Sequence, residues 1–155
     1  MDTTTLEGAY RDLLTAARDG GFRAPADQGA WTAEQVLAHV VATDRLLIGV
    51  TAELLAGGSP TYDNAVATRT PYLDALGRAA GGWDALVATV RATGLELVYL
   101  ARELHDSAAA TPVPTRIVDG DTVRVEAPMP WSGVLNTHAE VHLPEHRAQL
   151  DGLRG

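Results

Sequence analysis

The first apolar stripe of the chain lies between residues 6 and 19. Its members recur at intervals of three and four: Leu6, Tyr10, Leu13, Leu14 and Ala17. This spacing places the side chains on one face of an α-helix. Gly20 and Gly21 follow directly, and glycine commonly ends helices because it tolerates the left-handed backbone conformation. We therefore predict an amphipathic helix over residues 6–19.

The second stripe begins after Trp31 and has a clear starting signal. Thr32 and Gln35 have the spacing of a capping box, in which a hydroxyl and an amide three residues apart satisfy the first free N–H groups of a helix. Apolar residues then recur at helical spacing as far as Leu54, before Gly57 and Gly58. The pattern predicts a long second helix that begins after Thr32.

The rest of the chain alternates between two periods. Residues 59–70 are loop-like, and residues 71–106 form a third helical region that Gly81-Gly82 and Gly94 make either two helices or one bent helix. Between 112 and 128 the period changes to two, with Asp119-Gly120 as the turn of a short hairpin. A last helix runs from Trp131 to the C-terminus. We expect an all-α, up-and-down four-helix bundle with a β-hairpin before the last helix, in one domain over residues 1–155.

Composition narrows the class of protein. The 155 residues contain 12 basic and 20 acidic residues, a net charge of −8, and all the basic residues are arginine. Clustered basic residues are needed to bind phosphates, so nucleic acid is not an expected partner. The polar N-terminus resembles no signal peptide, and we find no apolar run long enough for a membrane helix. We therefore expect a soluble, cytoplasmic protein with no membrane partner.

The absence of cysteine excludes disulfides, thiolate metal ligands and a protein thiol as nucleophile. Histidine is the remaining metal-binding side chain of interest. One helix carries His39, and the last helix carries His138, His142 and His146 at successive intervals of four. Side chains four residues apart lie on the same helix face, so two imidazoles can reach one cation. The fifth histidine, His105, fits an ordinary position near a helix end.

Three histidines in a row leave two possible registers. Each step of four residues advances about 400° around the helix, so only a pair is expected to bind one cation together with His39. Pro144 predicts a kink between His142 and His146, because proline lacks an N–H and clashes with the preceding turn. The pair is either 138/142 or 142/146, and His142 belongs to both.

Two segments resemble the signatures of the DinB-like superfamily. The run from Trp31 to His39 is similar to the first, in which an aromatic residue and a helix cap precede a metal-binding histidine. The run from His142 to Leu150 is similar to the second, with histidine, three residues, histidine, two residues and glutamine. The resemblance implies that His39, His142 and His146 are metal ligands, with Gln149 at a common structural position after the last of them.

The resemblance also implies a chemistry. The thiol-dependent branch of this superfamily consists of S-transferases and isomerases that use a low-molecular-weight thiol such as mycothiol or bacillithiol. It implies a divalent metal, zinc first and nickel or another ion as alternatives, and a small electrophile as the second substrate. The lysine-free, glycine-rich composition suggests an actinobacterial source, in which mycothiol is the expected thiol. Members of the superfamily often form homodimers, which we note as a possible state.

Other side chains near the histidine helices are candidates for substrate contacts. They are Trp31, Trp131 and Arg147 for a pocket, and Asp44 and Glu145 for proton transfer or for orienting an imidazole. Two other functions stay open. The same metal can activate water in a hydrolase, lyase or isomerase, or the protein can bind a small ligand or a metal without catalysis.

Overall fold

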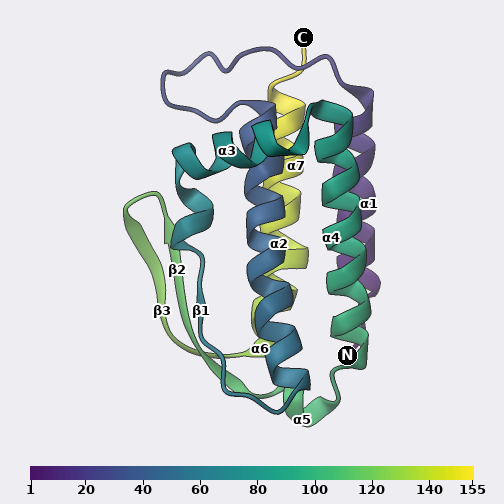
Figure 1. Ribbon diagram of the computed structural model, residues 1–155, viewed down its shortest axis with the longest axis vertical. Coiled ribbons are helices and arrows are strands. Elements are labelled where there is room, and N and C mark those ends of the chain that lie inside the picture. The colour runs from purple at the N-terminus through teal and green to yellow at the C-terminus, as the bar shows by residue number, and fades with distance from the viewer.

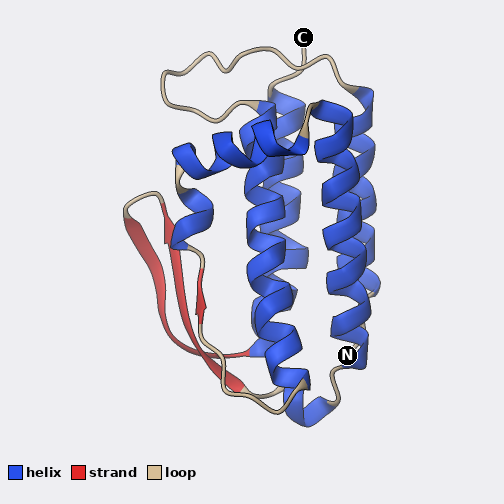
Figure 2. Cartoon of the chain, in the orientation of Figure 1, coloured by secondary structure: helices blue, strands red, loops and turns tan.

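The computed structural model describes residues 1–155, and most of the chain is helical (Figure 2). Three long helices, α1 (Thr4–Asp19), α2 (Ala33–Leu55) and α4 (Trp83–Glu103), lie beside a last helical stretch of α6 (Trp131–Thr137) and α7 (Leu143–Gly152) (Figure 1). The shorter helices are α3 (Thr70–Ala80), α5 (Asp106–Ala109) and a 3₁₀ helix (Ala65–Thr68). A mostly helical fold is confirmed.

The capping box that begins α2 is confirmed. The Gln35 N–H donates to Thr32 Oγ1 at 3.2 Å, and the Thr32 N–H donates to Gln35 Oε1 at 2.9 Å. The Gln35 side chain also donates to Asp74 of α3 at 2.8 Å, which joins the start of α2 to a second helix. Because these hydrogen bonds fix the first turn of α2, they also define the position of His39, two turns after Thr32.

The third helical region divides at one of its two glycine signals. Gly81 and Gly82 have φ values of 90° and 129° and separate α3 from α4. Gly94 lies inside α4 and does not interrupt it. A Cβ at Gly94 would lie 2.8 Å from a ring carbon of Tyr10, so this glycine lets α1 and α4 approach closely around that ring.

The predicted hairpin is present, and it is longer than the sequence indicates. Strands β2 (Pro112–Asp119) and β3 (Thr122–Pro130) pair antiparallel, with Asp119 opposite Thr122 and with Gly120 at φ 57° in the turn. A third strand, β1 (Tyr62–Asp63), pairs parallel with β2. The interpretation of residues 59–70 as loop alone is therefore wrong, because a strand of two residues shows no period in the sequence.

The last helical stretch contains one turn of π-helix, His138–His142, between α6 and α7. The Leu143 N–H donates to the His138 carbonyl, five residues back. Pro144 follows at the start of α7 and has no N–H with which to continue an α-helical ladder. The kink predicted between His142 and His146 is wrong in its position: the irregular turn ends at His142, and α7 is regular from Leu143 past His146.

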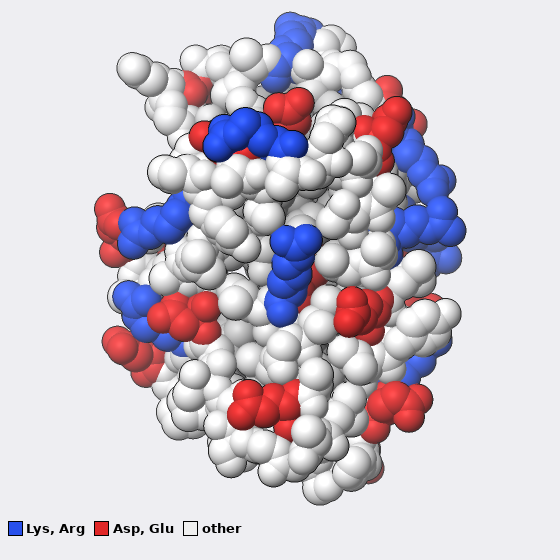
Figure 3. Space-filling model, viewed as in Figure 1, with Lys and Arg blue, Asp and Glu red and all other residues white.

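The helix α2 lies in the middle of the structure. By length and composition alone it could cross a membrane, but 67% of its apolar window is buried inside the protein. The core helix of a soluble protein has this pattern. On the outer surface, arginine and acidic side chains are interspersed over the face in Figure 3. This face has no continuous basic stripe.

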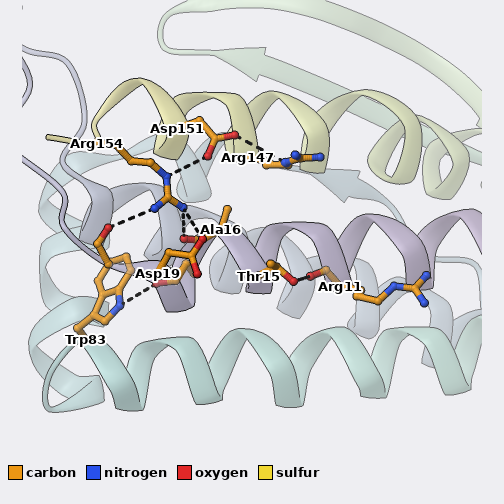
Figure 4. Close-up of polar contacts among 10 residues, drawn as sticks. Arg11, Thr15, Ala16, Asp19, Trp83, Arg147, Asp151 and Arg154 are labelled. Carbon is orange, nitrogen blue, oxygen red and sulfur yellow. Dashed lines mark hydrogen bonds and ion pairs between the residues drawn. The ribbon is translucent and has the colours of Figure 1, made fainter.

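The end of the chain holds the loop that precedes α2. Arg154 donates to the Ala16 carbonyl at 2.7 Å and to Asp151 at 3.2 Å, so it joins α1 to α7 (Figure 4). The Arg23 N–H donates to the Leu153 carbonyl at 2.7 Å. These bonds fix the beginning of the segment that leads from α1 to Trp31.

Candidate metal centre

The structure brings together the three histidines that the resemblance singles out. Nε2 of His142 lies 2.8 Å from Nε2 of His39 and 3.1 Å from Nε2 of His146. One nitrogen from each ring lies within 4.8 Å of the others, an arrangement that can hold a metal ion. His39 comes from α2, His142 from the π turn and His146 from α7. Their role as ligands stays a prediction. We call these three side chains the histidine triad.

Hydrogen bonds to the outer nitrogens orient two of the rings. Nδ1 of His39 lies 2.7 Å from the Ala67 carbonyl oxygen, and Nδ1 of His146 lies 2.8 Å from Gln149 Oε1. Both oxygens can only accept, so each Nδ1 must carry the proton. The Nε2 atoms that face one another therefore present lone pairs, as metal-binding histidines require.

Burial keeps the triad neutral at ordinary pH. It lowers the pKa of His39 to about 3 and that of His146 to about 4, with further contributions from neighbouring histidines. The pKa of His142 is also well below its usual value, because of burial and the three nearby imidazoles. Neutral imidazole is the form that binds a metal.

The triad is better satisfied by a cation than by protons. If Nε2 of His142 carries a proton, it can donate that proton to Nε2 of His39 or to Nε2 of His146, but not to both. The nitrogen that receives no proton then faces His142 without a hydrogen bond. Nδ1 of His142 is buried and has no hydrogen-bond partner. Three convergent imidazole nitrogens suit zinc and other borderline divalent ions, and three protein ligands leave at least one position open.

His138 points away from the triad, although its ring lies near that of His142. Its Nε2 lies 3.0 Å from the Tyr10 hydroxyl and 3.3 Å from Asp44 Oδ1. The Tyr10 proton is donated to Asp44 at 2.6 Å, so His138 Nε2 must donate as well and offers no lone pair. The 138/142 register is therefore not the one that the geometry favours.

The two tryptophan candidates have different positions. The ring of Trp31 lies 4.8 Å from that of His39 and 6.4 Å from that of His146, so it covers the triad on one side. Trp131 is fully buried in the core, and its indole N–H donates to Thr51 at 3.0 Å. The prediction that Trp131 contributes to a pocket at the histidines is not supported by these contacts.

The charged candidates also lie elsewhere. Arg147 is exposed on α7 and lies 3.7 Å from Asp151 of the same helix (Figure 4) and 3.6 Å from Asp12 of α1. Asp44 is fully buried and bonds to Tyr10 and Thr93 instead of to a triad member. Glu145 is exposed on the surface of α7. None of these three side chains has a hydrogen bond to the triad.

Sequence reasoning missed some of the groups that support the site. The carbonyl oxygen that orients His39 belongs to the backbone of Ala67, in a 3₁₀ helix. Every residue has such a carbonyl, so the residue type at position 67 does not indicate this role. The sequence assigns Tyr10 only to a helix stripe and gives Thr93 no role, yet in the structure the two hydroxyls donate to Asp44 and the Tyr10 oxygen lies beside His138. Only the pairing of distant helices reveals these partners.

The comparisons with known proteins agree with this picture at the level of the family. The family model described as the DinB superfamily matches residues 3–150. No curated protein and no solved structure matches the chain.

Proposed function

The chain belongs to the DinB superfamily, and from this premise we propose that it is a divalent-metal-dependent enzyme that transfers the sulfur of a low-molecular-weight thiol to a small electrophile. The superfamily includes metalloenzymes. We assign the fold to the four-helix bundle of the DinB-like type. The observation that carries the proposal is the convergence of three neutral imidazole nitrogens in a chain without cysteine.

The ligands in this proposal are His39, His142 and His146. A divalent cation supplies Lewis-acid chemistry, which lowers the pKa of a coordinating sulfur so that thiolate forms near neutral pH. The protein's own residues supply orientation: the Ala67 carbonyl and Gln149 hold two of the rings with their lone pairs inward. Trp31 covers one side of the triad and limits the access of water there.

The proposed reaction is a nucleophilic substitution at carbon. A sulfur–carbon bond forms, the bond between that carbon and the leaving group breaks, the leaving group departs with the electron pair, and the thiol proton passes to solvent. The protein contributes no sulfur, so the nucleophile must come from the cosubstrate. We propose mycothiol as the first thiol to test and bacillithiol as the second, with zinc before nickel as the metal.

The test measures loss of free thiol when metal-loaded protein meets either thiol and a model electrophile such as a chlorodinitroarene. Because the chain has no cysteine, all thiol in the assay belongs to the cosubstrate. We expect consumption that requires metal, is lost in His39→Ala and is retained in His105→Ala, whose exposed side chain lies outside the triad. The absence of thiol consumption by fully loaded protein contradicts the proposal. Turnover without any thiol indicates that water is the nucleophile.

A further inference from the structure

Two buried side-chain atoms have no hydrogen-bond partner in the protein. They are Nδ1 of His142 and the hydroxyl oxygen of Thr43. Buried polar groups are nearly always paired, because an unpaired one gives up its hydrogen bonds to water without replacement. The two atoms are complementary, since a ring N–H donates and a hydroxyl oxygen accepts.

Thr43 lies on α2 opposite the π turn that carries His142. The helix α2 and the last helical stretch run side by side in opposite directions (Figure 1). His39 of α2 meets His142, with their Nε2 atoms 2.8 Å apart, and further along α2 Asp44 lies 3.3 Å from His138. Each residue of a helix advances about 100°, so Thr43 projects between His39 and Asp44. It is only 3% exposed, so its hydroxyl is enclosed between α2 and the π turn.

The hydroxyl of Thr43 differs from those of other threonines inside helices. Four of these donate to the carbonyl four residues back, at 2.7–2.9 Å: Thr15, Thr51, Thr89 and Thr137. Thr43 makes no such bond to the His39 carbonyl. Threonine in a helix has two favoured rotamers, so its oxygen can change partner without a movement of the backbone. The Thr43 hydroxyl is thus available to another group.

Metal binding determines what His142 requires. Its Nε2 faces the other two members of the triad and must present a lone pair to a cation, so the ring proton must then lie on Nδ1. The corresponding protons of the other two ligands are accepted by the Ala67 carbonyl and by Gln149. Metal-binding histidines almost always donate this outer N–H to an acceptor. His142 is the one member of the triad that lacks such a partner.

We propose that Thr43 is the positioning residue of His142: its hydroxyl oxygen accepts the Nδ1 proton of His142 when a metal occupies the triad. The Thr43 hydroxyl donates in turn to the His39 carbonyl, the ordinary acceptor for a threonine at this place in a helix. This single change satisfies both unpaired atoms and gives every ligand an outer partner. The inference rests on the proposed function only for the metal, and it is the same whether a thiol or water is the nucleophile.

Thr43→Val tests the role of the hydroxyl and keeps the shape of the side chain. We expect its zinc affinity, measured by competition with a metal-binding dye, to fall about 10–100-fold, because the Nδ1 proton of His142 then has no acceptor. Thr43→Ser restores the hydroxyl and should restore the affinity. Stability should not fall with affinity: the urea midpoint of metal-free Thr43→Val should equal or exceed that of the wild type, since a methyl group replaces an unpaired buried hydroxyl.

Thr51→Val is the matched control, because Thr51 lies on the same helix and is also fully buried. Its hydroxyl accepts from the Trp131 indole at 3.0 Å and donates to the Leu47 carbonyl at 2.7 Å. Its removal leaves a buried indole N–H unpaired, so we expect a lower urea midpoint and an unchanged zinc affinity. A merely structural role for Thr43 predicts this same combination for Thr43→Val.

The ring of His142 gives a readout that is independent of affinity. In ¹H–¹⁵N spectra of the zinc-loaded wild type, we expect a slowly exchanging Nδ1 proton on His142, as for a buried and hydrogen-bonded N–H. The resonance of this proton should move upfield in zinc-loaded Thr43→Val, because the proton loses its acceptor, and return in Thr43→Ser.

The inference is wrong if Thr43→Val binds zinc like the wild type or if Thr43→Ser binds zinc as weakly as Thr43→Val. It is also wrong if the His142 proton has the same resonance in Thr43→Val and in the wild type. Normal zinc binding by Thr43→Val, together with thiol consumption by the wild type, rejects this inference alone. The expected loss of affinity without thiol consumption by the loaded wild type rejects the proposed thiol reaction alone. A wild type that binds no zinc contradicts both.

Discussion

His138 and His142 are separated by one helical turn and belong to two different buried clusters. His138 joins Tyr10, Asp44 and Thr93 in a network where both carboxylate oxygens accept hydroxyl hydrogen bonds of 2.6 Å. His142 belongs to a triad whose three Nε2 atoms face one another. Either all three carry lone pairs, or a single proton is shared among them. A buried polar cluster that satisfies itself stabilises a fold, and one that does not is a place for a ligand.

The π turn separates these two roles. It covers His138–His142 and ends just before Pro144, so the residues on either side of it are offset from an α-helical register. An ordinary helix would place His138 and His142 on adjoining parts of one face. In the structure, the ring of His138 faces Asp44 and that of His142 faces His39.

The largest expected effect comes from removing the Asp44 carboxylate from the hydrogen-bond network that it forms with Tyr10, Thr93 and His138. Asp44 is the one acidic residue among the buried residues. Asp44→Ala removes the carboxylate that accepts the 2.6 Å hydrogen bonds of the Tyr10 and Thr93 hydroxyls and that lies 3.3 Å from Nε2 of His138. We expect a loss of about 3–5 kcal/mol in the free energy of unfolding, measured by urea denaturation of metal-free protein.

The exposed Asp121→Ala is the control for that change and should leave stability nearly the same. If metal-free Asp44→Ala is as stable as the wild type, the network is not the structural element that we infer. A folded Asp44→Ala protein is still expected to bind metal, because Asp44 contacts no triad member.

The next effect is the response of metal-free protein to acid. His39 and His146 have pKa values of about 3 and about 4 in the folded state, below the value of about 6.5 for an exposed histidine. The unfolded chain therefore takes up protons first as the pH falls. The contribution of each histidine to the free energy of unfolding is fully present above about pH 6.5 and is lost as the pH falls. At pH 4.5 we expect a loss on the order of 2 kcal/mol for His39 and the same for His146.

Urea denaturation between pH 7.5 and pH 4.5 measures this decline. His146→Gln should show a shallower dependence on pH, because it removes one of the three buried histidines whose pKa values are lowered. A wild-type stability that is constant across this range would contradict the assignment of buried, neutral histidines.

A smaller effect is expected from the group that orients His146. Gln149→Ala removes the acceptor of the Nδ1 proton and leaves the triad intact. Loss of such partners typically weakens metal affinity about 10–100-fold. Competition with a metal-binding dye measures the change. Arg147→Ala, on the exposed side of the same helix, should leave the affinity as it is in the wild type.

Local signals in the sequence were sufficient for several parts of this structure. The capping box at Thr32, the helix ends at Gly20 and Gly81, and the hairpin around Gly120 all depend on residues that lie near one another in the chain. The histidine spacing and the resemblance selected the three residues that the structure brings together. Helix caps, turns and helix faces each depend on residues only a few positions apart, so the sequence alone can indicate them.

The remaining features depend on contacts between distant segments. The Ala67 carbonyl reaches His39 across 28 positions, and Tyr10 reaches His138 across 128. Periodicity assigned Tyr10 to a helix stripe, which is correct, but could not show that its hydroxyl bonds to Asp44. The choice between the two histidine registers likewise depended on this contact, because Tyr10 and Asp44 occupy His138.

The most direct test of the account is the metal content of four proteins prepared identically without chelator. These are the wild type, His142→Ala, His138→Ala and His105→Ala, each analysed by plasma mass spectrometry. The account predicts about one equivalent of a divalent metal in the wild type, His138→Ala and His105→Ala, and almost none in His142→Ala. Metal retained by His142→Ala, or absent from the wild type even after reconstitution, would contradict it.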